Sequence, residues 1–199
     1  MRRIILASSN SGKLRELKQL LAGLDIELQP QSAFAISSVE ESRPSFVENA
    51  ILKARHAAHR SQLPALADDS GLIVDALGGA PGVYSARYAG PEASDQQNLS
   101  KLLDALEGVP DSMRTARFYC VMVYLMHSAD PMPCICEGTW EGRILRNPQG
   151  HGGFGYDPIF YVPTHGCSAA ELPQELKNAV SHRGQALRNL MERLTIRDA

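Results

Sequence analysis

An apolar strand, a short polar loop and an amphipathic helix follow one another at the start of this chain. Residues 2–7 are strand-like, and the helix begins at Leu14. The small side chains of the loop leave peptide N–H groups uncovered, Gly12 permits a sharp turn, and the helix directs its positive end at the loop. We therefore predict a phosphate site, with an ordinary Ser-rich helix cap as the alternative. The loop departs from a Walker A sequence at Ala7 and Leu14, and its residues are Ser8, Ser9, Asn10, Ser11, Gly12 and Lys13.

Strand-like and helix-like segments alternate along the rest of the chain. This interleaving predicts an α/β fold with a mixed central β-sheet flanked by helices. A chain of 199 residues with 44% hydrophobic residues can bury one sizeable core, so we expect a single domain over residues 1–199. After a first helix that ends near Gly23, the predicted strands are 26–28, 63–67 continuing as 72–76, 117–126, 134–140, 142–146 and 159–162, and the predicted helices are 45–60, 94–106, 169–178 and 183–195.

Composition excludes several classes of protein. A net charge of −2 argues against a nucleic-acid-binding surface, which needs a broad basic excess. No apolar stretch approaches the roughly twenty residues of a membrane span, and the apolar run 4–7 is too short for a signal peptide. The four cysteines are predicted to be reduced thiols. We therefore expect a cytoplasmic protein that binds neither nucleic acid nor a membrane.

Two acidic pairs are candidate metal ligands. Asp68 and Asp69 follow an apolar strand, and since neighbouring strand residues face opposite sides, one carboxylate should face a ligand while the other supports it. The sequence Asp-Asp-Ser-Gly also has turn chemistry, so a solvated turn is the alternative. Glu40 and Glu41 lie in a loop and would alone be surface charges. Beside a phosphate loop, one carboxylate from each pair would suffice for Mg²⁺.

Two later segments could contact a nucleotide base. The glycine-rich segment 150–158 contains Phe154 and Tyr156, whose rings could stack on a base, although the segment could equally be a hairpin loop. Ser181, His182 and Arg183 open the last predicted helix and supply hydrogen-bond donors. An N-cap serine beside a surface histidine and arginine is the alternative.

Taken in order, these motifs resemble the inosine triphosphate pyrophosphatase family, whose bacterial members are XTP/dITP diphosphatases. The resemblance covers nearly the whole chain, and Ser9 departs from it where many members carry glycine. It implies an elongated α/β fold with two lobes and an active-site cleft between them, magnesium dependence and a homodimer. It rests on residues 8–13, 40–41, 46–50, 67–71, 78–87, 153–158 and 181–183.

The resemblance also implies roles for individual residues. Asp69 is similar to the family's general base and magnesium ligand, with Asp68 and Glu41 or Glu40 completing the metal shell. The loop residues Ser8 to Lys13 would bind the phosphates, and Lys53 would lie on a helix facing them. The remaining substrate-binding set would be Ser70, Phe154, Gly155, Tyr156, Asp157, Lys177, His182 and Arg183.

The implied reaction is hydrolysis of non-standard purine nucleoside triphosphates (ITP, dITP and XTP) to the monophosphate and pyrophosphate, which removes them from the nucleotide pool. Donors from His182 and Arg183 would pair with a 6-keto group and oppose the 6-amino group of adenine. The alternatives are a pyrophosphatase for modified pyrimidine nucleotides and a non-catalytic nucleotide sensor. An RNA-binding module would need a basic stripe that this sequence lacks.

Overall fold

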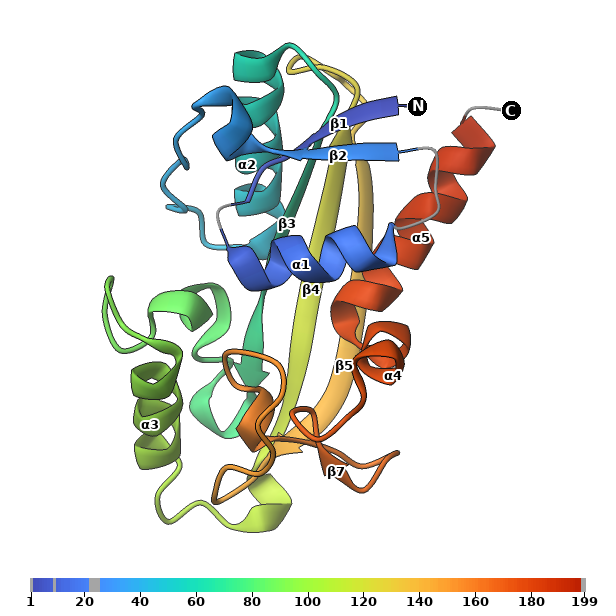
Figure 1. Cartoon of the computed structure of the whole chain (residues 1–199). Helices are drawn as coiled ribbons and strands as arrows, with labels where there is room; N and C mark the ends of the chain where they lie inside the picture. Colours follow the sequence, from blue (N-terminus) through green and yellow to red (C-terminus); the bar gives the residue numbers. More distant parts are fainter. Residues whose placement is uncertain (1, 9, 22–25, 198–199) are drawn as a thin grey trace. The chain divides into compact units, whose positions relative to one another are not determined.

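The computed structural model describes residues 2–8, 10–21 and 26–197 and contains a seven-stranded sheet in the order β2-β1-β3-β4-β5-β6-β7 (Figure 1). Strand β1 pairs in parallel with β2 and β3, whereas β6 pairs antiparallel with β5 and β7, so the predicted mixed α/β sheet is confirmed. The strands are β1 (Arg2–Leu6), β2 (Ile26–Pro30), β3 (Ala65–Val74), β4 (Thr115–Leu125), β5 (Cys134–Ile144), β6 (Phe160–Val162) and β7 (Cys167–Ser168). The α-helices are α1 (Ser11–Leu20), α2 (Phe46–Ser61), α3 (Asp95–Ala105), α4 (Gln174–Val180) and α5 (His182–Arg197).

The chain forms two compact units, and strands β3, β4 and β5 each contribute residues to both. Unit 1 consists of Met1–Asp69, Cys120–Gly138 and Arg183–Ala199. Unit 2 consists of Ser70–Tyr119 and Thr139–His182. Each unit has its own hydrophobic core. The two-lobed arrangement with a cleft stays a prediction.

The core of unit 1 lies where α1 and α5 cover one face of its strands. Ile4 and Leu6 belong to this cluster, whereas Ile5 between them is buried toward the opposite face, as strand alternation requires. Helix α2 packs against β1 and buries a stripe of small residues that includes Ala50 and Ala54. The cluster with α1 and α5 contains Ile4, Leu6, Leu17, Leu21, Leu66, Cys120, Met122, Tyr124, Cys134, Cys136, Ala186, Leu187, Leu190 and Leu194.

The core of unit 2 is rich in aromatic side chains. The Phe118 ring centroid lies 4.5 Å from that of Phe160 and 6.3 Å from that of Trp140. Helix α3 contributes Leu99 and Leu102 from its buried face. The capping box of Ser94 fixes the start of this helix.

Two predicted boundaries near the polar motifs are wrong. Helix α1 begins at Ser11 rather than at Leu14, because the Asn10 side chain accepts a hydrogen bond from the Lys13 backbone N–H at 3.0 Å and caps the helix there. Gly12 therefore lies in the first helical turn and makes no sharp turn. Strand β3 continues without interruption through Asp68 and Asp69, so the solvated-turn alternative is excluded. The predicted end of α1 near Gly23 lies outside the described residues.

Two other differences lie in the second half of the chain. Strand β5 is continuous through Gly142, where two separate strands, 134–140 and 142–146, were predicted. A Cβ atom at Gly142 would lie 2.5 Å from both Phe160 Cζ and Tyr161 O. Glycine at this position therefore allows β6 to approach β5 closely. Helix α4 begins only at Gln174, five residues later than predicted from position 169.

Two expectations from composition can be compared with the structure. The four cysteines are free thiols, as predicted, and Cys120, Cys134 and Cys136 are buried. Within residues 2–8, 10–21 and 26–197, no helix is both long enough and apolar enough to cross a membrane.

Candidate active site

The loop between β1 and α1 is held by short-range hydrogen bonds. The Asn10 backbone N–H donates to Ser8 Oγ at 3.3 Å, and Asn10 Oδ1 in turn accepts from the Lys13 N–H. These contacts bring the Lys13 side chain to the start of α1, where the helix dipole is positive. Ser11 and Gly12 lie in this first turn, and Ser9 lies outside the described residues. The predicted phosphate loop is therefore a helix N-terminus with an added lysine charge.

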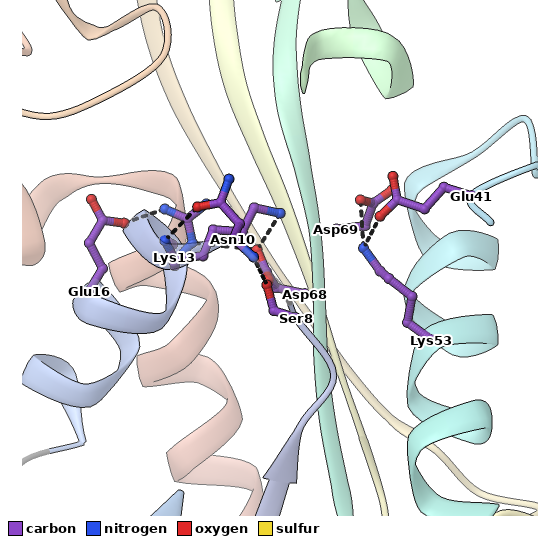
Figure 2. A network of polar contacts seen from close by, with 9 residues as sticks. Ser8, Asn10, Lys13, Glu16, Glu41, Lys53, Asp68 and Asp69 are labelled. Carbon is purple, nitrogen blue, oxygen red and sulfur yellow. Dashed lines mark hydrogen bonds and ion pairs between the residues drawn. The ribbon is translucent and has the colours of Figure 1, made fainter. Parts of the chain in front are cut away.

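Asp68 and Asp69 point to opposite sides of β3, as the alternation of a strand predicts (Figure 2). Asp68 Oδ2 lies 2.9 Å from Lys13 Nζ, on the side of α1. Asp69 Oδ1 lies 2.9 Å from Lys53 Nζ, which projects from α2. Each carboxylate therefore has its own cation, although the two residues are adjacent in the chain.

The second acidic pair contributes Glu41 to this cluster. Lys53 Nζ donates to Glu41 Oε1 at 2.7 Å as well as to Asp69, so one ammonium group bridges two carboxylates (Figure 2). Glu40 is exposed to solvent. The sequence left open whether Glu40 or Glu41 contributes to the site. The structure shows that the Glu41 side chain contacts Lys53, the lysine that also pairs with Asp69.

The two aspartates differ in proton affinity. Burial alone would raise the pKa of Asp68, but the charges of Lys13, Arg183 and Lys53 outweigh it and hold that pKa well below its usual range. Burial also raises the pKa of Asp69, and there the nearby Lys53 and Lys13 only partly offset it. Asp69 is therefore the stronger base, and Asp68 is a permanent anion at neutral pH.

Lys53 remains a cation in this environment. Burial lowers the pKa of its ammonium group, but the carboxylates of Asp69, Asp68 and Glu41 outweigh burial, and the net shift is upward. The Lys53 side chain is only 11% exposed. It carries a fixed positive charge inside the acidic cluster.

The oxygens around Asp69 suit a divalent cation. Asp69 Oδ2 is buried and has no hydrogen-bond partner among the described residues, which is costly for a carboxylate oxygen. Carboxylate oxygens with room for phosphate oxygens and water are the ligand set that Mg²⁺ prefers. In the described part of the chain, no three His, Cys, Asp or Glu side chains converge as a ready-made metal cage. Two carboxylates, from Asp69 and Glu41, are available here.

Sequence reasoning missed Glu16, a buried carboxylate of unit 1. Glu16 on α1 is 7% exposed, and its Oε2 accepts a hydrogen bond from Arg183 Nη1 on α5. Arg183 Nε also lies 3.5 Å from Asp68 Oδ2. The alternative of a surface arginine at this position is therefore excluded. Glu16 follows Lys13 by three residues on the same helical face, which is the one sequence signal that could have identified it.

The remaining predicted substrate residues lie in unit 2. Asp157 and Lys177 form a buried ion pair at 2.7 Å, and Asp157 Oδ2 also accepts from the Phe154 backbone N–H at 2.7 Å. Lys177 Nζ lies 5.2 Å from the centroid of the Phe154 ring. The Gly155 N–H donates to Asp95 at the start of α3. The glycine-rich segment is thus fixed by side chains, and Ser70 lies half-buried on β3.

Two of these residues are more buried than a simple binding surface suggests. The Tyr156 ring lies in the core of unit 2, and its hydroxyl donates to Ser85 O at 2.8 Å, so of the two aromatic residues only Phe154 is partly exposed. The His182 ring is 6% exposed and stacks on Phe118 with centroids 4.8 Å apart. The alternative of a surface histidine at this position is also excluded.

Residues 4–193 match the model of the Ham1 family. The chain belongs to the Ham1 family. It is 58% identical over 194 residues to a dITP/XTP pyrophosphatase of Shigella flexneri, with 98% of each chain covered. The Ham1 resemblance extends to solved structures. A HAM1 protein from Coxiella burnetii matches with a TM-score of 0.91 and 55% identity, covering 98% of this chain and 99% of that one.

A second solved structure that matches this chain is that of a protein named for an activity. The nucleoside-triphosphatase / dITP/XTP pyrophosphatase from Mycobacterium abscessus matches with a TM-score of 0.75 and 41% identity, covering 96% of this chain and 99% of that one. The family resemblance inferred from the sequence motifs is therefore confirmed.

Proposed function

We propose that this chain hydrolyses the non-standard purine nucleoside triphosphates dITP, XTP and ITP to the monophosphate and pyrophosphate. The observation that carries this proposal is that Asp68 and Asp69 lie on opposite faces of β3 and pair with different lysines. One carboxylate is a permanent anion beside the phosphate loop, and the other is a base beside a second lysine. The names of the relatives, which cover the whole length of the chain, supply the substrate class.

The triphosphate would bind at the start of α1. The N-terminus of this helix and the Lys13 ammonium group attract anions, and each charge-assisted hydrogen bond contributes roughly 1.5–3 kcal/mol. Lys53 would approach the same phosphates from α2. We assign Ser8 to Lys13 and Lys53 to phosphate binding on these grounds.

Magnesium fits the residues around Asp69, and we propose that Asp69 and Glu41 hold it. When bound, Mg²⁺ would polarise phosphoryl oxygens and neutralise their negative charge. Asp68 lies on the opposite side of β3, where it pairs with Lys13 and Arg183. We therefore assign it a supporting role next to the metal ligands.

Asp69 would act as the general base. Its raised pKa makes its carboxylate a better proton acceptor than an exposed aspartate. Asp69 takes a proton from a water molecule while the water oxygen forms a bond to the α-phosphorus. The bond between this phosphorus and the α–β bridging oxygen breaks, and pyrophosphate leaves with the electron pair. Positioning and charge neutralisation supply most of the catalysis in such transfers.

The base-recognition residues are proposed from the family resemblance. Phe154 offers the partly exposed ring, and the buried Asp157–Lys177 pair holds its backbone in place. His182 and Arg183 remain the predicted readers of the 6-keto group, together with Ser70, Gly155 and Tyr156 as further substrate contacts. The homodimer is likewise proposed from the resemblance alone.

The test is a nucleotide panel with separate detection of pyrophosphate and orthophosphate. We expect Mg²⁺-dependent release of pyrophosphate from ITP, dITP and XTP, little release from ATP and GTP, and none with EDTA. Binding of ITP without hydrolysis would favour a nucleotide sensor. Hydrolysis restricted to modified pyrimidine nucleotides would favour the related pyrophosphatase. Either result would overturn the proposal.

A further inference from the structure

Glu16 and Arg183 form a buried ion pair within unit 1. The Arg183 guanidinium donates from Nη1 to Glu16 Oε2, and the two side chains are 3% and 9% exposed, respectively. The residues are 167 positions apart in the chain. The pair therefore joins α1 to the start of α5, at a depth where unpaired charges are very costly.

The same guanidinium group also faces Asp68 on β3. Arg183 Nε lies 3.5 Å from Asp68 Oδ2, and this oxygen lies 2.9 Å from Lys13 Nζ. Glu16, Arg183, Asp68 and Lys13 thus form a chain of alternating charges. Its two ends, Lys13 and Glu16, are three residues apart on one face of α1. Helix α1 is therefore connected to Asp68 twice, once directly and once through Arg183.

Stability alone does not explain this arrangement. A buried ion pair is often no more stabilising than well-packed apolar residues of similar volume, but its geometry is more specific. The planar guanidinium group presents its donors in a fixed fork, so two carboxylates on different elements can fix its orientation. The arrangement defines where the start of α1 lies relative to Asp68, and hence relative to the adjacent Asp69.

We propose that Glu16 is a positioning residue: it holds Arg183 against Asp68 and so fixes Lys13 and the phosphate loop relative to the base Asp69. This inference rests on the proposed function. Without the Glu16 carboxylate, Arg183 would turn fully to Asp68 and compete there with Lys13. The phosphate loop would lose its alignment with Asp69, and a misplacement of about 1 Å can lower turnover by about 100-fold.

The test compares Glu16→Gln with the wild type and with Glu137→Gln, a matched change at an exposed position on β5. For Glu16→Gln we expect kcat to fall by about 10–100-fold with ITP while KM changes by less than about threefold. Because Glu16 acts on the alignment of the phosphate loop, kcat should fall for ATP as well as for ITP. The double variant Glu16→Gln, Arg183→Lys should be no slower than the slower single variant.

Crystal structures of the wild type and Glu16→Gln provide a readout that does not depend on activity. We expect the contact between Lys13 Nζ and Asp68 Oδ2 to lengthen beyond hydrogen-bond distance in the variant. If Glu16→Gln does not fold, Glu16→Asp takes its place, since its carboxylate is withdrawn by one methylene and should also lower kcat.

Three results would overturn the inference: turnover equal to the wild type in a folded Glu16 variant, an unchanged Lys13–Asp68 contact, or a loss confined to ITP selectivity. The last result would mean that Glu16 serves only base recognition by Arg183. A wild-type protein that hydrolyses no nucleotide would instead refute the proposed function, and the crystal structures would still decide the role of Glu16.

Discussion

The ammonium group of Lys53 lies 2.9 Å from the carboxylate of Asp69. The same ammonium group also binds Glu41, so it occupies the space between the two carboxylates proposed to hold Mg²⁺. The position of Lys53 therefore affects the proton affinity of Asp69 and the proposed binding of both Mg²⁺ and phosphate. Substitutions of single residues can test each of these effects.

Asp69→Asn should lower kcat by at least about 1,000-fold, because the amide cannot accept the proton that the carboxylate takes. ITP should still bind, since Lys13 and the start of α1 are unchanged. Turnover measured with pyrophosphate detection and binding measured by calorimetry separate the two effects. Asp104→Asn, an exposed change on α3, is the control and should behave as the wild type. Near-normal turnover of Asp69→Asn would remove Asp69 as the base.

Lys53→Gln should bind Mg²⁺ about tenfold or more tightly than the wild type in the absence of nucleotide. The reason is that a positive charge about 4 Å from the site repels the ion by several kcal/mol at an intermediate dielectric constant. Lys53→Arg keeps the charge and should leave the affinity low. Calorimetric titration with Mg²⁺ measures both. Lys101→Gln on α3 is the control. Unchanged or weaker Mg²⁺ binding by Lys53→Gln would show that Lys53 does not compete with the metal.

Asp68→Asn should destabilise the protein by about 3 kcal/mol at neutral pH, because it breaks a buried ion pair. The pKa of Asp68 is lower in the folded than in the unfolded protein, so its stabilisation is present above its unfolded pKa of about 3.9. It is lost as the pH falls through the folded value. Urea unfolding between about pH 7 and about pH 2 should show a difference between the two proteins that is constant above about pH 4 and narrows progressively below it. A difference that stays constant with pH would contradict this assignment.

Lys177→Met should destabilise the protein by about 3–5 kcal/mol, because it leaves the buried Asp157 carboxylate without its cation. Adding Asp157→Asn removes the uncompensated charge, so the double variant should recover part of the loss. A double-mutant cycle from urea unfolding gives the coupling between the two positions. Strictly additive effects would show that the pair is energetically unimportant.

The sequence could predict features that depend on local geometry. Alternation along a strand was enough to separate Asp68 from Asp69, and the polar loop before Leu14 was enough to locate a helix N-terminus with Lys13 beside it. The C-terminal end of β3 could not be predicted from local sequence. Asp-Asp-Ser-Gly has the composition of a turn, and only pairing with neighbouring strands keeps it extended.

Features that depend on distant contacts could not be predicted. Nothing near Glu16 in the sequence indicates that its partner is Arg183, and the choice between Glu40 and Glu41 depends on the reach of Lys53 from α2. Tyr156 looked like an exposed stacking residue because its segment is rich in glycine. Its ring is buried because β-strands and α3 of unit 2 surround it, which no local pattern reveals.

The opposed directions of Asp68 and Asp69 also constrain how this protein can evolve. A single-residue insertion or deletion earlier in β3 would shift the pleat and exchange the surroundings of the two carboxylates. Asp68 would then face the side of Lys53 and Asp69 the side of Lys13, and their proton affinities would change with their surroundings. Homologues that retain the chemistry should therefore conserve the length of this strand more strictly than the identity of its apolar side chains.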